Sequence, residues 1–167
     1  MPSNIEIKAR AGDWGRQIAA ARALADRTEE LIQEDTFFNC PSGRLKLREI
    51  KGGESYLIFY LRSDLKGPKS SVYYPSAVKD PASMKALLGA AFGAGKIVKK
   101  TRILLLSGAT RIHFDEVSGL GRFIELEVCM RDGQSRAEGE AAAGAFMDRL
   151  GIVEADLLDR AYADMLA

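Results

Sequence analysis

Alternation of charged and apolar residues at every second position constrains this chain more than any other feature. It occurs in four short segments, Glu6-Ile7-Lys8, Arg44-Leu45-Lys46-Leu47-Arg48, Arg111-Ile112-His113-Phe114-Asp115 and Glu125-Leu126-Glu127. Successive side chains of a β-strand point to opposite faces, so each segment predicts a strand with one apolar and one charged face. Some of these strands carry cations, and another carries two carboxylates. Gathered on one surface, they predict an anion site beside a metal site.

The remaining patterns predict an α+β fold with about eight antiparallel strands. Asp13 is suited to cap a helix that runs to about Arg27, and Asp80-Pro81 opens a second helix that ends near Gly93. The chain from about Arg136 is expected to be helical, with an interruption at Gly151. Strands are expected over residues 4–10, 30–39, 44–50, 55–62, 71–74, 96–106, 109–117 and 122–131. So many antiparallel strands can close into a barrel.

Size and composition fit one domain over residues 1–167. The net charge of +1 provides no global field to recruit nucleic acid or an anionic membrane surface. No apolar run approaches the ~18 residues of a membrane span, and no signal peptide is recognised, so we expect a cytoplasmic protein. Cys40 and Cys129 lack a paired spacing and are expected to be reduced structural thiols. The sequence leaves open whether the chain forms a homodimer.

The charged faces are predicted to line the inside of the barrel. Three helical segments need an apolar sheet face to cover, and the alternating apolar residues supply that face on the outside. The alternative is that the charged faces are solvated, but they carry few of the Ser, Thr and Gln residues that decorate solvent-facing strands. By parity, the inward set is Lys8, Arg44, Lys46, Arg48, Arg62, Lys100, Arg102 and Arg111, with the acids Glu6, Asp115, Glu125 and Glu127.

This inward set predicts a metal–polyphosphate ligand. Unpaired buried charges cost roughly several kcal/mol each, so an excess of cations requires a polyanion. Arg holds phosphate through forked hydrogen bonds and Lys holds it as a point charge. Clustered carboxylates suit a hard divalent cation, Mg²⁺ or Mn²⁺, which commonly accompanies phosphates.

Six segments together resemble the CYTH superfamily, the triphosphate tunnel metalloenzymes, which include class IV adenylyl cyclases, thiamine triphosphatases and inorganic triphosphatases. They are residues 4–8 (Asn-Ile-Glu-Ile-Lys), 43–48, 57–62, 98–102, 111–117 and 119–127 (Gly-Leu-Gly-Arg-Phe-Ile-Glu-Leu-Glu), and their order and parity match the family. The resemblance implies an eight-stranded antiparallel tunnel with a triphosphate threaded through its basic interior.

The resemblance also implies roles for the inward residues. Those matching the metal-binding positions are Glu6, Glu125 and Glu127, with Asp115 as a further metal-associated acid. Those matching the phosphate-binding positions are Lys8, Arg44, Lys46, Arg62, Lys100, Arg102 and Arg111. Glu6, Glu127 and Lys8 are expected to take part in catalysis.

Asn4 departs from the family's opening motif, Glu-x-Glu-x-Lys, because it stands where the first Glu belongs. An amide oxygen can ligate a hard cation but brings no charge. The leading function is metal-dependent hydrolysis of a small organic or inorganic triphosphate, such as ATP, thiamine triphosphate or tripolyphosphate. Conversion of ATP to cyclic AMP and pyrophosphate is the second. Binding of a polyphosphate or nucleotide without turnover is the third.

Three other residues on the charged faces carry open interpretations. His113, the only histidine, is expected to be a hydrogen-bonding residue of the wall, with acid–base catalysis as the alternative. Tyr60 shares the face of Arg62 and is expected either to contact substrate or to pack. Arg48 lies near a strand end, where it could simply pair with an acid at the rim.

Overall fold

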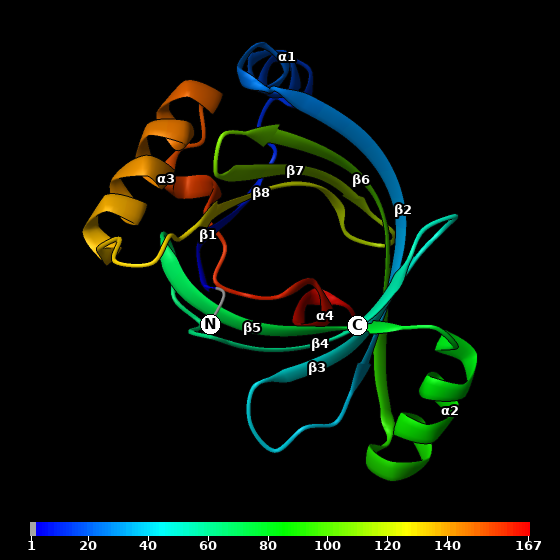
Figure 1. The fold of residues 1–167 in the computed structure, drawn as a ribbon. Helices are drawn as coiled ribbons and strands as arrows, with labels where there is room; N and C mark the ends of the chain where they lie inside the picture. Colours follow the sequence, from blue (N-terminus) through cyan, green and yellow to red (C-terminus); the bar gives the residue numbers. More distant parts are fainter. Residues whose placement is uncertain (1–2) are drawn as a thin grey trace.

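The computed structural model describes residues 3–167 as a closed antiparallel β-barrel with helices around it (Figure 1). Its strands are β1 (Ser3–Arg10), β2 (Arg27–Phe38), β3 (Arg44–Ile50), β4 (Ser55–Arg62), β5 (Lys69–Val78), β6 (Ala94–Ser107), β7 (Thr110–Val117) and β8 (Gly121–Cys129). Around the ring they follow the order β1-β5-β4-β3-β2-β6-β7-β8, and β8 pairs with β1. The predicted α+β barrel is therefore confirmed.

Three helices pack on the outside of the barrel (Figure 1). They are α1 (Trp14–Leu24), α2 (Pro81–Phe92) and α3 (Arg136–Leu150), and each begins at a side-chain cap on Asp13, Asp80 or Ser135. Helices α1 and α3 share an apolar cluster with the outward residues of β1, β7 and β8. Helix α2 covers the outward face of β3 around Leu47. The alternating apolar residues thus form the core outside the barrel wall.

Helix α3 lies unusually close to β1. A Cβ atom placed on Gly139 would come within 2.6 Å of the Ile5 side chain and 2.5 Å of the Met130 sulfur, so only glycine permits this approach. The close contact holds β1 firmly against the helix layer. That matters for function because the opposite face of β1 carries Glu6 and Lys8.

Several predicted boundaries of the helices and strands are wrong. Strand β5 has ten residues in place of the four expected at 71–74. It continues through Pro75, which lies beyond Val72, the last β5 residue that pairs with β1 in the described part of the chain. The missing N–H of Pro75 therefore breaks no bond to described residues of β1. The helix that ends at Leu24 and the strand that begins at Arg27 likewise differ by three residues from the prediction.

The C-terminal segment differs most from the sequence-based expectation. Gly151 ends α3 in a left-handed conformation, as the predicted interruption requires. Beyond it the chain is mostly extended, with a 3₁₀ turn (Glu154–Asp156) and the short helix α4 (Tyr162–Met165). The amide of Leu158 donates to the carbonyl oxygen of Lys8, which ties this segment to β1. Helix α4 lies inside the ring of strands (Figure 1).

No helix among residues 3–167 combines the length and the apolar character needed to cross a membrane. Cys40 and Cys129 both carry free thiols.

Candidate functional site

The barrel encloses a cavity of about 490 Å³, a volume that suits a small ligand. Every strand contributes to the wall, because every second residue points inward. Apart from His113, the ionisable side chains of this wall are eight basic and four acidic ones: Lys8, Lys46, Arg48, Arg62, Lys69, Lys100, Arg102 and Arg111, with Glu6, Asp35, Glu125 and Glu127. The cavity is therefore lined by twice as many basic as acidic side chains.

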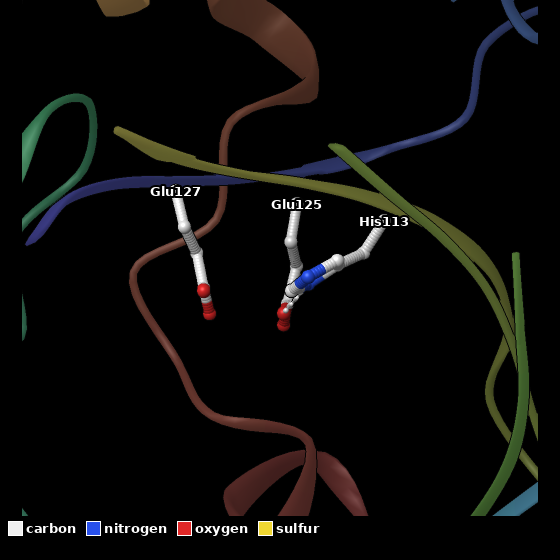
Figure 2. A group of neighbouring side chains, drawn as sticks. All are labelled: His113, Glu125 and Glu127. Atoms are coloured by element: carbon white, nitrogen blue, oxygen red, sulfur yellow. Dashed lines mark hydrogen bonds and ion pairs between the residues drawn. The ribbon is translucent and has the colours of Figure 1, made fainter. Parts of the chain in front are cut away.

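A group of three potential metal ligands lies on neighbouring strands of this wall (Figure 2). Glu125 and Glu127 are two residues apart on β8, so their carboxylates point the same way. His113 faces Glu125 across the β7–β8 ladder, and its Nδ1 atom lies 3.4 Å from Glu125 Oε2. One ligand atom from each residue lies within 4.8 Å of the others.

The electrostatic surroundings keep this group suited to a cation. Burial and the nearby Arg102 charge lower the pKa of His113, so its ring is neutral near pH 7 and offers a lone pair. Burial alone would raise the pKa of Glu127, but nearby groups, the Arg111 charge among them, lower it below its ordinary value. Two ionised carboxylates and a neutral imidazole are ligands that divalent metals accept.

Glu6 and Asn4 bring further oxygen atoms from β1 to the same cavity. Glu6 is opposite Glu127 in the β1–β8 register. Burial and the charge of Glu127 raise the pKa of Glu6 to about 7. Asn4 is 3% exposed and lines the cavity, and its Oδ1 atom has no hydrogen-bond partner among the described residues. A divalent cation would give the Asn4 oxygen a partner and would offset the repulsion between the Glu6 and Glu127 carboxylates.

Glu125 is also held by cations. The Lys8 ammonium lies 3.2 Å from Oε1, and an Arg102 Nη2 atom lies 3.1 Å from Oε2. Although burial opposes ionisation, the Lys8 charge and the hydrogen bond from His113 hold the pKa of Glu125 well below its ordinary value. Glu125 therefore contacts both the potential metal ligand His113 and the cations Lys8 and Arg102.

Asp115 is not part of the potential metal-ligand group. Its side chain is fully buried, and Arg102 donates to both carboxylate oxygens over 2.7 and 2.6 Å. The hydroxyl of Tyr162 donates to Oδ2 over 2.9 Å. With both oxygens engaged, Asp115 fixes the guanidinium of Arg102 in one orientation. A direct role in metal binding stays a prediction.

Asp35 organises three cations that face the cavity, and the sequence analysis missed it. Lys46 lies 3.0 Å away, and Arg48 donates to both carboxylate oxygens over 2.8 and 2.7 Å. The Lys100 ammonium is 4.0 Å from Oδ2. Arg48 therefore does pair with an acid, but inside the barrel. The available signal was parity, since Gln33, Asp35 and Phe37 all line the cavity.

Arg62 presents unused donors to the cavity. Its side chain is 7% exposed, and its Nε and Nη2 atoms have no hydrogen-bond partner among residues 3–167. Its Nη1 atom is 3.9 Å from a Glu6 oxygen. Arg111, across the barrel, places Nε 3.0 Å from Glu127. Buried guanidinium donors without partners are costly, so Arg62 is poised to receive an anion.

Lys69 is a further cation that the sequence analysis missed, because β5 was predicted to start at residue 71. It is opposite Glu6 in the β1–β5 register, and its side chain is almost completely buried. Its ammonium donates to the carbonyl oxygen of Leu65 over 2.7 Å. Burial and the nearby Arg62 charge lower the pKa of Lys69 to about 8.

The C-terminal segment closes one end of the cavity. Ala161 and Tyr162 line the wall, and the Tyr162 ring lies 3.8 Å from the Lys8 ammonium. Arg44, at this end, forms a forked pair with Asp164 over 3.0 and 2.5 Å and is not among the residues lining the cavity. Arg44 is the one predicted phosphate-binding residue that does not line the cavity. Tyr60, in contrast, lines the cavity, on the face that it shares with Arg62.

Comparison with known proteins gives a family. A family model described as the CYTH domain matches residues 3–162. None of the curated proteins matches the chain.

Solved structures of similar fold cover nearly the whole chain. The PH1012 protein of Pyrococcus horikoshii is 24% identical with a TM-score of 0.87, over 98% of this chain and 99% of that one. A Vibrio parahaemolyticus protein proposed to be an adenylate cyclase is 22% identical with a TM-score of 0.79, over 97% and 96%. The Hippeastrum protein HpAC1, proposed to be an adenylyl cyclase but with a dominant triphosphatase activity, is 16% identical with a TM-score of 0.61, over 89% and 88%. At these identities the likeness shows the fold.

Proposed function

This chain belongs to the CYTH domain family, and on that premise we propose that it binds a triphosphate with a divalent cation inside its barrel and hydrolyses it. The observation that carries the proposal is the enclosed cavity with eight cations and four carboxylates. A triphosphate supplies the negative charge that such a wall lacks.

In this proposal one side of the cavity binds the metal ion and the other side binds the phosphate chain. On β1, β7 and β8, Glu6, His113, Glu125 and Glu127 would hold Mg²⁺ or Mn²⁺, with Asn4 as a neutral oxygen ligand. The bound ion would neutralise phosphate charge and stabilise the leaving group.

The phosphate chain is held by side chains from the remaining wall. Arg62 has free donors, and Lys46, Arg48 and Lys100 are aligned by Asp35. Asp115 orients Arg102 in the same way. Because these cations are already positioned before a ligand arrives, little reorganisation accompanies binding.

The reaction needs little covalent chemistry from the protein. A water oxygen forms a bond to the terminal phosphorus, and the bond from that phosphorus to the bridging oxygen breaks. The products are orthophosphate, the shortened phosphate and one proton. Glu6 and Glu127 would take part by holding the cation close to the attacking water, and Lys8 offsets charge beside Glu125.

Cyclisation of ATP is the second candidate, favoured by the likeness in fold to the Vibrio parahaemolyticus protein. There the ribose hydroxyl attacks the α-phosphorus and pyrophosphate leaves. Binding without turnover is the third, favoured by Asn4, because the site has one carboxylate fewer than the family's opening motif provides.

One set of incubations separates these functions. The protein is mixed with Mg²⁺ or Mn²⁺ and with ATP, thiamine triphosphate or tripolyphosphate, and the products are resolved by anion-exchange chromatography. We expect orthophosphate; cyclic AMP with pyrophosphate would identify the cyclase, and binding without products would identify a binding protein.

A variant pair tests whether the cavity is the site. Arg62→Ala removes a guanidinium with unused donors, and we expect triphosphate affinity to fall by about 10- to 100-fold, the range for a hydrogen bond to a charged group. Arg122→Ala is the matched control, because Arg122 is exposed on β8 and pairs with Glu116. Equal affinities in the two variants would place the site elsewhere.

A further inference from the structure

No helix of residues 3–167 crosses the middle of the outer surface of β4 and β5 (Figure 1). Helices α1 and α3 pack on β1, β7 and β8, and α2 packs on β3. Helix α2 shares an apolar cluster with Leu57 and Val78, which lie at the end of these strands near the β3–β4 turn. The rest of this outer surface therefore faces away from the barrel without a helix over it.

The outward residues of these two fully described strands include no charged side chain. Alternation places four residues of β4 and five of β5 on the outside, and three of them are serines. The other six are apolar, and we call them the β4–β5 outer face: Leu57, Phe59, Leu61, Val72, Tyr74 and Val78. Leu61 is 45% exposed and Tyr74 is 43% exposed, so water reaches the middle of this face.

Outward residues on other strands differ from this face. Exposed or half-buried outward positions there carry charges, such as Glu34 on β2, Lys99 on β6 and Glu116 on β7. The β4–β5 outer face is contiguous, because its residues pair across the two strands and the rings of Phe59 and Tyr74 lie 6.1 Å apart. Single exposed apolar residues are ordinary, but a contiguous group with a charged rim marks an interaction surface.

The charges at the two ends of the face favour a second copy of the chain as its partner. Lys51, Glu54 and Lys79 are exposed at the turn end, and Asp64 and Lys66 are exposed in the loop at the other end. A copy rotated by half a turn about an axis through the middle of the face brings its loop end over the turn end of the first copy. Acids then meet bases at both ends. Because neither end has one sign alone, the face does not select an anionic membrane or a strongly charged partner.

We propose that this chain forms a twofold-symmetric dimer in which the β4–β5 outer faces of two copies pack against each other, sheet on sheet. Each copy then covers the half-exposed apolar side chains of the other, which is the source of the free energy of association. The dimer is independent of the proposed function, because these side chains lie on the opposite side of the barrel wall from the cavity.

The size of the face suits a weak dimer. The eight residues of β4 span about 25 Å, and two strands with their side chains are about 15 Å wide. With the charged ends included, the two copies together bury about 1,000 Å², the lower limit for a specific interface. We therefore expect a dissociation constant in the micromolar range.

Sedimentation velocity of the full chain without ligand, at concentrations from about 1 to about 300 μM, tests the dimer. We expect the sedimentation coefficient to rise from that of a monomer to that of a dimer and then to level off, because a twofold face is used up when two copies pair. Monomers at every concentration, or association that continues beyond a dimer, would overturn the inference.

Two variants place a charge in the face. Leu61→Lys adds a cation to the apolar contact, and Ser76→Glu adds an acid at an outward position of β5 that is already exposed. Each should raise the dissociation constant of the dimer at least about 100-fold, because the new charge loses water without gaining a partner. Leu87→Lys is the matched control, because Leu87 is 61% exposed but lies on α2, outside the face.

Melting temperatures of the dilute proteins show whether the variants are folded. If Leu61→Lys melts well below the wild type, Ser76→Glu decides in its place. A dimer whose affinity the folded face variant leaves unchanged would overturn the inference. So would a dimer that Leu87→Lys weakens as strongly as the face variant does.

Discussion

Replacing Asp35 by Asn should destabilise the protein strongly and make it depend on an anion for stability. Asp35 is buried and is the shared partner of Lys46, Arg48 and Lys100. Arg48 and Lys46 hold its pKa well below the ordinary value even though burial opposes ionisation. The amide keeps the shape of the side chain but removes the charge, so buried Lys100 and partly buried Lys46 and Arg48 lose their common counterion.

Removing one partner of a buried ion pair costs about 3–5 kcal/mol. For a chain of this length, each kcal/mol shifts the melting temperature by about 2–4 °C, so we expect a decrease of about 10 °C. Tripolyphosphate should raise the melting temperature of Asp35→Asn more than that of the wild type, because the cations that have lost Asp35 bind phosphate. At a ligand concentration one hundred times Kd, the stabilisation is about 2.7 kcal/mol.

Differential scanning fluorimetry with and without tripolyphosphate measures both effects. Glu34→Gln is the control: Glu34 precedes Asp35 on β2, points outward and forms long ion pairs with Lys85 and Lys99, at 3.7 and 3.8 Å. Its loss should cost less than about 1 kcal/mol. If Asp35→Asn melts within about 2 °C of the wild type, or if tripolyphosphate raises both melting temperatures equally, the reasoning is refuted.

Three further predictions concern the acids and one buried amine. Glu127→Gln should lower Mn²⁺ affinity by at least about tenfold in calorimetry while the chain stays folded, because it removes a charged ligand; unchanged affinity would contradict the metal assignment. Asn4→Glu should raise Mn²⁺ affinity by about tenfold, and no gain would mean that position 4 does not reach the ion. Lys69 is charged below its folded pKa of about 8, and in the unfolded chain it stays charged to about 10.4, so stability should rise as pH increases between these values. Melting curves should show a smaller rise for Lys69→Met than for the wild type, because Lys8, Lys46 and Lys100, whose pKa values are also lowered by burial, contribute to it in both proteins.

The sequence predicted the barrel wall well because the signal there is local. A period of two assigns each residue to a face, and the need of the helices for an apolar surface then places the charged face inside. Glu6, Arg62, Arg102 and Glu127 all lie where parity places them.

What the sequence did not predict depends on contacts between distant segments. In β2, charged residues lie on both faces, so Glu34 and Asp35 could not be separated without knowing that Asp35 meets Arg48 and Lys46. The final segment carries no strong pattern of its own, and its path is set by bonds to β1 and by the pairs that Tyr162 and Asp164 form inside the barrel.

The apolar residues that line the cavity were missed for a related reason. Leu31, Ile50 and Leu104 read as ordinary strand residues, because hydrophobic side chains in a sheet are usually core. Only the closed barrel shows that these side chains line the same cavity as Ile58.

Pairing of β1 with β8 also limits how the chain can fold during its synthesis. Residues 4–10 have their partners at 123–129, so the ring stays open until most of the polypeptide has left the ribosome. Until then the inward cations lack their enclosing wall, and the unpaired edge of β1 can join another chain. Since such distant pairing slows folding, we expect a slow, late step, after which the last residues dock into a ring that already exists.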